Sequence, residues 1–262
     1  MKYNPVKQEI ADAERFEEIL NILAENEASH LIRKLGLSDH LPVKHRHKKE
    51  KPSPERLREI MEELGPTFVK FGQIMAQRPD IVPENYIDEL EKLEGDVKPF
   101  SSQKAKTIVD NEIDLDTFDE FNEEPIAAAS IAQVHKAWID GEKVAVKIRR
   151  PGIKEKMRTD IDLMKYMAAK GEKHSKKLEK MHISDIIDEF ANWTLDELDL
   201  EQEASNAEAF QKNLEDEKNL KVPDVYPENT TEKVLVMEFV EGVKCTNKEE
   251  MDKLDIDREK VA

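Results

Sequence analysis

The sequence predicts an α+β fold, in which a five-stranded antiparallel sheet packs against helices and follows a helical N-terminal region. Before residue 100, apolar residues recur every three or four positions, which is the spacing of amphipathic helices. Asp140-Gly141 separates two runs of alternating β-branched and aromatic residues, a pattern typical of a β-hairpin. The nearly continuous apolar run VLVMEFV, residues 234–240, indicates a central strand.

These patterns assign the elements in chain order. Helices are expected over residues 7–36 (one helix or a broken pair), 54–64, 66–77 and 86–93, followed by strands near 118–126, 131–139 and 143–149. Two long helices are then expected over 153–180 and 183–214, and two further strands over 221–226 and 233–240. Gly65-Pro66 separates two of the early helices, because glycine ends a helix and proline suits a first helical turn.

The composition restricts the class of protein. The 262 residues carry a net charge of −17, which disfavours non-specific binding to nucleic acids. The one cysteine, Cys245, excludes an intramolecular disulfide and a cysteine-based zinc site. No uncharged apolar run approaches the roughly 18 residues that a membrane span needs, and the N-terminus lacks the apolar core of a signal peptide. We therefore expect a cytoplasmic protein.

A basic cluster interrupts the acidic chain at residues 44–49 and Lys51, between Pro42 and Pro52. This composition predicts a solvated linker. Contact with anionic lipid at a membrane surface, or with nucleic acid, is the alternative interpretation.

The motif VAVK ends at Lys147 in a predicted strand, where alternation places Ala145 and Lys147 on the same face. In protein kinases the lysine of such a strand contacts the α- and β-phosphates of the nucleotide and pairs with a helix glutamate. The motif alone is weak, because a strand lysine often extends from a sheet edge into solvent.

Acidic residues in the long helix that follows could supply the partner carboxylate. Asp199 and Glu203 are four residues apart and would share one helix face, whereas Glu197 would lie elsewhere around the helix. A solvated acidic face is the alternative interpretation of this segment.

Small residues occupy the predicted connection between the first two strands: Ala127, Ala128, Ala129 and Ser130. Protein kinases use a glycine-rich loop there, because glycine lets backbone N–H groups approach the phosphates. Alanine in place of glycine either damages or retunes such a phosphate site. An ordinary turn of small residues would have the same composition.

Four segments, in this order, resemble the UbiB/AarF/ADCK family of atypical kinase-like proteins. They are KFGQ (residues 70–73), the alanine-rich segment at 126–130, VAVK followed by RRPG (144–152), and ELD at 197–199 followed by Glu203-Ala204. The first is similar to the KxGQ signature of the family and the last to its ExD element. The order of the four segments argues against a chance match more strongly than any single motif does.

The resemblance implies a protein-kinase-like N-lobe preceded by a helical extension, and a role for each matching residue. Lys147 would pair with Glu203 and contact the phosphates of ATP or ADP, and the alanine-rich segment would shape nucleotide affinity. Lys70 and Gln73 would reach into the site and meet Glu197 and Asp199. Residues 237–240 would form the hinge, where the backbone of Glu238 and Val240 binds adenine.

The resemblance also implies a division of the chain. The expected parts are an N-terminal helical segment (1–42), a basic linker (43–53), a helical extension carrying the KxGQ motif (54–115), the N-lobe (116–245) and the start of a C-lobe (246–262). A kinase fold takes its catalytic-loop Asp and Asn and its DFG Asp from beyond the hinge, and residues 243–262 contain no DFG. We therefore expect the C-lobe to be absent, with Mg²⁺ bound only when a C-lobe is supplied.

Two functions remain open on this basis. The chain is either the ATP-binding N-terminal part of a UbiB-like kinase or ATPase that supports isoprenoid-quinone or lipid metabolism, as a fragment or as half of a split kinase completed in trans. Alternatively, it is a non-catalytic module that binds a nucleotide or a partner protein. Enzymatic activity of the chain alone is uncertain on either interpretation.

Overall fold

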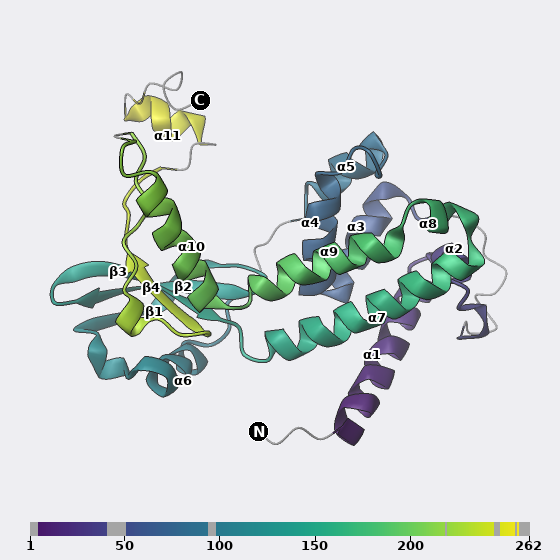
Figure 1. The fold of residues 1–262 in the computed structure, drawn as a ribbon, viewed down its shortest axis with the longest axis horizontal. Coiled ribbons are helices and arrows are strands. Elements are labelled where there is room, and N and C mark those ends of the chain that lie inside the picture. The colour runs from purple at the N-terminus through teal and green to yellow at the C-terminus, as the bar shows by residue number, and fades with distance from the viewer. Residues whose placement is uncertain are drawn as a thin grey trace.

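The computed structural model describes residues 5–40, 51–93, 98–217, 219–243, 247–254 and 256. Figure 1 shows the sheet at one end of the molecule and a group of helices at the other, joined by the long helices α7 (Ile153–His174) and α9 (Ile183–Asp196). The basic cluster at 44–49 and Cys245 lie outside the described residues, as do residues 94–97.

The helical body contains the early helices and three later ones. They are α1 (Pro5–Glu25), α2 (Ser29–Lys34), α3 (Pro54–Leu64), α4 (Pro66–Ala76), α5 (Glu84–Leu90), α7 (Ile153–His174), α8 (Lys176–Lys180) and α9 (Ile183–Asp196), with a 3-10 turn at Ser38–His40. Their apolar faces form one core, which includes Ile19, Ile60, Ile161 and Phe190. At the junction of α3 and α4, Gly65 has φ +99°, a conformation that favours glycine.

The sheet has four antiparallel strands in the order β1-β2-β3-β4. The strands are β1 (Glu120–Ala128), β2 (Ala132–Ile139), β3 (Glu142–Arg149) and β4 (Val234–Glu238). Asp140 (φ 51°) and Gly141 (φ 80°) form the turn between β2 and β3, as their sequence predicts. Helix α6 (Ser102–Ile113) packs on one face of the sheet through Ala105 and Val109.

The remaining elements follow or flank the sheet. Helix α10 (Leu200–Asn213) packs on β4 through Leu200, Ala204 and Leu235. Two 3-10 turns lie at Leu115–Thr117 and Pro227–Asn229, and helix α11 (Lys248–Lys253) follows β4.

Several predicted boundaries differ from the structure. The predicted fifth strand, residues 221–226, is reduced to one isolated bridge between Val225 and Met237, because Pro223 lacks the N–H that a ladder needs. Strand β4 ends at Glu238 rather than at residue 240. The helical prediction over 7–36 resolves into the pair α1 and α2, separated at Glu27, whose φ is +64°.

The two long helices predicted after the hairpin are each divided. The first becomes α7 and α8, and the second becomes α9 and α10, with the break at residues 197–199. Helix α6 was not predicted, since its segment SQKAKTIVDNEI presents few apolar residues and only Ala105 and Val109 are buried. No helix of the described residues is both long and apolar enough to cross a membrane.

His135 lies on β2 with its ring buried between defined partners. Nδ1 lies 2.9 Å from the carbonyl oxygen of Asn122 and must donate to it, so Nε2 accepts from the Gln133 amide at 2.7 Å. The Gln133 carbonyl in turn accepts from the backbone N–H of Phe100 at 3.0 Å. Burial lowers the pKa of His135, and its hydrogen bond to Asn122 opposes that shift. A second proton on the His135 ring, at Nε2, would face the N–H group of the Gln133 amide, which disfavours the charged ring.

The protein should therefore lose stability as the pH falls below about 6.5, where histidine of the unfolded chain takes up a proton and folded His135 stays neutral. Below that pH the unfolded state binds more protons, so the free energy of unfolding decreases with acidification. The decrease in Tm between pH 7.5 and pH 5.5 should be smaller in His135→Gln than in the control His182→Gln, whose ring is 76% exposed. Equal pH slopes in the two variants would contradict this account.

Candidate functional site

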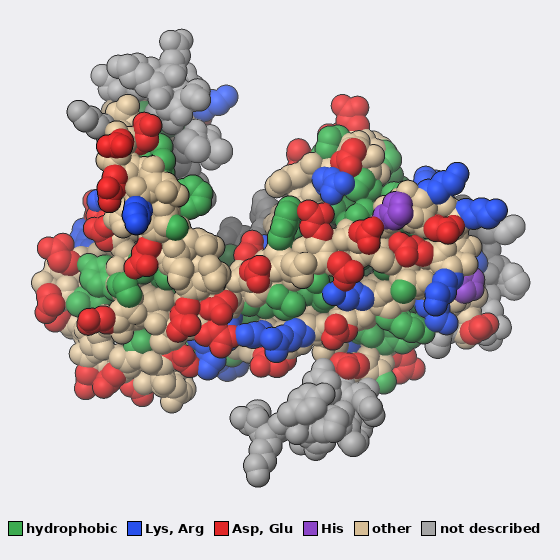
Figure 2. All heavy atoms as spheres, in the orientation of Figure 1, with side chains coloured by type: hydrophobic (Ala, Val, Ile, Leu, Met, Phe, Trp, Pro, Cys, Tyr) green, Lys and Arg blue, Asp and Glu red, His purple; other side chains and the backbone are tan. Residues whose placement is uncertain are grey.

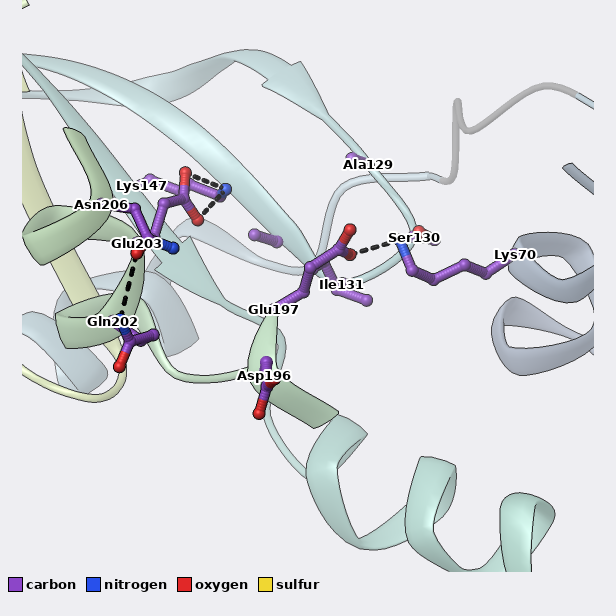
Figure 3. A pocket seen from close by; sticks show the side chains of 11 residues that line it. Lys70, Ala129, Ser130, Ile131, Lys147, Asp196, Glu197, Gln202, Glu203 and Asn206 are labelled. Carbon is purple, nitrogen blue, oxygen red and sulfur yellow. Dashed lines mark hydrogen bonds and ion pairs between the residues drawn. The ribbon is translucent and has the colours of Figure 1, made fainter. Parts of the chain in front are cut away.

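A hollow of about 430 Å³ lies between the sheet and the helical body (Figure 3). The sheet, helix α4 and the junction of α9 and α10 all contribute to it. Its lining residues are Lys70, Ala129, Ser130, Ile131, Ala132, Lys147, Asp196, Glu197, Gln202, Glu203 and Asn206.

Lys147 and Glu203 form an ion pair on one side of this hollow. Val146 and Ile148 face the buried core of the sheet, so strand alternation turns Lys147 to the opposite face. The Lys147 Nζ donates to both carboxylate oxygens of Glu203, at 2.7 and 2.6 Å. Glu203 belongs to α10, and the packing of Leu200 and Ala204 on β4 brings this helix close to β3. The structure thus contains the lysine–glutamate pair that the resemblance implies.

A second ion pair, between Lys70 and Glu197, lies across the hollow. Figure 3 shows Lys70 extending from the helical body toward Glu197, which follows the last turn of α9. The side chain of Lys70 is 15% exposed and that of Glu197 is 50% exposed, so the pair is partly open to solvent. The KxGQ helix and the ExD element therefore meet at this point, as the resemblance implies for these two residues.

The break between α9 and α10 is held by a buried arginine that the sequence analysis did not single out. The Nη1 of Arg149 donates to the carbonyl oxygen of Leu198 and, at 3.1 Å, to that of Glu232. Asp199 caps α10 by accepting from the backbone N–H of Glu201 at 3.1 Å. Asp199 is therefore the N-cap residue of α10, and it does not line the hollow. Its carbonyl accepts from the Glu203 N–H at 3.2 Å, so the two residues lie one helical turn apart as their spacing predicts, but only Glu203 lines the hollow.

The alanine-rich segment is divided between a strand and a turn. Ala127 and Ala128 belong to β1 and lie outside the lining, whereas Ala129 and Ser130 line the hollow. The Ala129 N–H donates to the carbonyl of Ala132 at 2.8 Å, and Arg150 Nε donates to the Ala129 carbonyl at 2.9 Å. The turn is thus shorter than predicted, because ladder pairing with β2 continues to Ala128.

Gln73 lies away from Glu197 and Asp199. Its amide donates to the carbonyl of Leu93 at 2.9 Å, and it lines a separate hollow between α4 and α5. The expectation that it reaches the same site as Lys70 is not met. Gly72, the third residue of the KFGQ segment, packs closely against Leu93 and Met61, so an added Cβ would displace the ends of these two side chains.

The predicted hinge residues also lie outside the hollow. The backbone N–H of Glu238 donates to the carbonyl of Asp224 at 2.7 Å, and that of Phe239 donates to the carbonyl of Lys143 at 3.1 Å. The Glu238 carboxylate pairs with Lys221, which lowers the pKa of Glu238. Val240 is 49% exposed.

Sequence reasoning missed five of the lining residues: Ile131, Ala132, Asp196, Gln202 and Asn206. A helical signal was available for two of them, because Gln202 and Asn206 are one turn apart on the face that carries Glu203. Gln202 Nε2 donates to Asn206 Oδ1 at 3.1 Å. The described residues contain no group of three or more His, Cys, Asp or Glu side chains that could hold a metal ion.

Comparisons with known proteins identify the family of this chain. The family described as the ABC1 atypical kinase-like domain matches residues 92–262. The chain is 40% identical over 210 residues to Protein ACTIVITY OF BC1 COMPLEX KINASE 8, chloroplastic, of Arabidopsis thaliana, covering 78% of this chain and 28% of that protein. It is 38% identical over 206 residues to the Probable protein kinase UbiB of Azotobacter vinelandii, covering 77% and 38%.

A solved structure, Rv3197 in complex with erythromycin from Mycobacterium tuberculosis, is 33% identical with a TM-score of 0.48, and the match covers 71% of this chain and 48% of that one. The chain belongs to the ABC1 atypical kinase-like family, which includes the UbiB and ADCK proteins. It spans less than two fifths of the length of the two curated relatives named above.

Proposed function

We propose that the hollow binds the phosphates of ATP or ADP, and that the chain is the nucleotide-binding part of a UbiB-like atypical kinase or ATPase. The Lys147–Glu203 ion pair is the observation that carries this proposal. It places an ammonium group in a hollow of about 430 Å³, a volume typical of small-molecule sites. Glu203 holds the lysine side chain in the position from which it would contact phosphate oxygens.

The turn at Ala129 and Ser130 fits the phosphate end of a nucleotide. Its side chains are small, so a phosphate group could approach the backbone closely, and the Ser130 hydroxyl could donate to a phosphate oxygen. Ala127 and Ala128 would act on nucleotide affinity only through the conformation of β1. Arg150 holds the turn through the Ala129 carbonyl.

At the adenine end, part of the predicted hinge backbone is already hydrogen-bonded within the protein. The backbone N–H groups of Glu238 and Phe239 already donate within the protein, which leaves Val240 as the candidate hinge contact. Protein kinases bind Mg²⁺ through a catalytic-loop Asn and the DFG Asp. We therefore assign Mg²⁺ binding and phosphoryl transfer to a C-lobe, supplied by the same protein or in trans.

The roles of the KxGQ and ExD residues belong to the same proposal. Lys70 and Glu197 face the hollow and would meet the nucleotide or its metal ion from the side opposite Lys147. Gln73 and Asp199 would take part only after leaving the Leu93 carbonyl and the α10 N-terminus, respectively.

A role of the whole protein in isoprenoid-quinone or lipid metabolism is a proposal supported by the UbiB names of the relatives. Cytoplasmic location is a prediction from the composition, and peripheral membrane contact is the alternative that the basic cluster at residues 44–49 leaves open. The alternative is a module that binds a nucleotide or a partner protein without catalysis. Nucleotide binding without hydrolysis in the longest native form of the protein would favour the alternative.

Replacing Lys147 by alanine should weaken ATP binding about 10- to 100-fold, the loss expected for a charge-assisted hydrogen bond of about 1.5–3 kcal/mol. ATP should raise the Tm of the wild-type chain by mass action, and this increase should nearly vanish in the variant. A thermal-shift titration with ATP measures both the affinity for ATP and the increase in Tm, in the wild-type chain and in the variant.

Lys143→Ala is the matched control, because Lys143 lies on the same strand and pairs with Glu241 outside the hollow. Equal ATP-dependent stabilisation of the two variants would refute the assignment of Lys147. An unchanged Tm of the wild-type chain at millimolar ATP would remove the proposal altogether.

A further inference from the structure

A second cavity, of about 330 Å³ and partly open to solvent, lies in the helical body and is separate from the polar hollow. Helices α1, α2, α3, α4, α7, α8 and α9 all contribute to it. Its lining residues are Ile19, Leu23, Leu31, Lys34, Leu35, Leu57, Ile60, Met61, Leu64, Phe68, Phe71, Met164, Met167, Ala168, Leu178, Ile183 and Ile187.

The wall of this cavity is apolar. Of the lining residues that the structure describes, only Lys34 carries a polar side chain. An apolar wall of this kind favours apolar guests, because water finds no hydrogen-bond partners on it. An apolar guest would gain the burial of its own surface at about 25 cal/mol per Å². A nucleotide or a sugar would leave its polar groups unpaired.

The shape of the cavity limits the width of the guest. Most of the lining side chains are buried; Ile60 is 1% exposed and Ala168 is 3% exposed. A flexible hydrocarbon chain suits buried side chains of this kind better than a partner helix, whose diameter is about 10 Å.

Positive charge surrounds one end of the cavity. Lys34 on α2 and Leu178 on α8 both line it, and Lys177 on α8 and Lys51 both act on Lys34. Burial, and then the charges of Lys177 and Lys51, lower the pKa of Lys34, so a nearby anion would relieve an unfavourable field. Figure 2 shows Lys and Arg side chains gathered at the end of the helical body where α2 and α8 lie.

We propose that this cavity binds a single-chain anionic amphiphile of the fatty-acid type, with its hydrocarbon chain among the apolar residues and its carboxylate at Lys34. The apolar wall selects the chain and the lysines select the charge of the head group. The proposal does not depend on nucleotide binding, since none of the cavity residues lines the polar hollow.

Isothermal titration calorimetry of the full 262-residue chain tests this proposal, with laurate kept below its critical micelle concentration. Saturable binding of one laurate per chain is expected. Dodecyltrimethylammonium, which has the same chain length and the opposite charge, should bind at least about five-fold more weakly, as expected for an ion pair worth about 1 kcal/mol. Equal affinity for the two amphiphiles would overturn the role of Lys34.

Two variants distinguish the cavity from the surface around it. Ala168→Phe adds a phenyl ring to the cavity wall and should abolish laurate binding. Lys34→Glu should weaken laurate binding about ten-fold and strengthen dodecyltrimethylammonium binding, while the exposed control Lys180→Glu on α8 should leave both unchanged. If Ala168→Phe does not fold, as judged by circular dichroism, the reversal in Lys34→Glu still decides the question.

A parallel measurement separates a free amphiphile from a membrane surface. The fraction of protein that sediments with phosphatidylglycerol vesicles should depend on the basic surface formed by Lys34, Lys51 and Lys177. It should not change in Ala168→Phe. Laurate binding that survives Ala168→Phe in a folded protein would overturn the cavity assignment and point to adsorption on the basic surface.

Discussion

Replacing Asp160 by alanine should lower the free energy of unfolding by about 3–5 kcal/mol, the cost of breaking a buried ion pair by removing one partner. Asp160 is fully buried on α7 and links three parts of the helical body. It accepts from Arg15 Nε of α1 at 2.7 Å and from the Thr67 hydroxyl of α4 at 2.6 Å. Arg15 also donates to the carbonyl of Leu64 at the end of α3, at 2.6 Å. Without the carboxylate, the Arg15 guanidinium, whose side chain is 10% exposed, would lose its main partner.

Urea denaturation measures this effect. Asp162→Ala is the matched control, because Asp162 lies on the same helix with its side chain exposed, and its loss should change stability by about 0.5 kcal/mol or less. Asp160→Asn keeps the shape and part of the hydrogen bonding, so it should fall between the two. A free energy of unfolding for Asp160→Ala that matches the Asp162 control would show that the Arg15–Asp160 pair does not stabilise the helical body.

Replacing Arg149 by alanine is the second change with a large expected effect, a loss of about 3 kcal/mol. The guanidinium is almost fully buried and donates to the carbonyls of Leu198 and Glu232 and, at 3.2 Å, to the Glu232 carboxylate. Hydrogen bonds from a charged donor contribute about 1.5–3 kcal/mol each, and the two carbonyls would lose their partner in a buried place. Because Leu198 lies in the break between α9 and α10, the loss should also loosen the attachment of α10, which carries Glu203.

Hydrogen exchange separates a local effect from a general one. The amides of α10 and β4 should exchange faster in Arg149→Ala, while those of α3 and α7 keep their protection. Arg158→Ala, an exposed arginine on α7, serves as the control and should leave exchange unchanged. A uniform increase in exchange over the whole chain would contradict a specific role of Arg149 at the α9–α10 break.

Lys147 and Glu203 show how much of the site the sequence pattern alone predicts. Strand alternation places Lys147 on the face of β3 opposite Val146 and Ile148, and the helical spacing after residue 199 places Glu203 on a helix. Neither pattern says that two side chains 56 residues apart meet within 2.7 Å. The family resemblance implied that meeting, and the packing of α10 on β4 accounts for it in this chain.

Gln73 and Asp199 show where motif reasoning stops. Both stand at their expected places in the motifs, yet the Gln73 amide donates to the Leu93 carbonyl, 20 residues further along the chain, and Asp199 accepts from the nearby Glu201 N–H. Side-chain bonds to the backbone of this kind compete with the contacts that a motif suggests. Helix α6 escaped prediction for another reason. Of its residues only Ala105 and Val109 are buried, so its apolar periodicity is weak.

The sequence by itself determined the local structure of this protein: the hairpin around Asp140-Gly141, the strand that carries Lys147, the helices α3 and α4, and the membership in the atypical kinase-like family. Periodicity and turn chemistry act over a few residues, so these features are readable from the chain. Only the tertiary structure decided the break at 197–199 and the apolar cavity built from seven helices. These features depend on which faces pack together across long stretches of chain, and no local pattern contains that information.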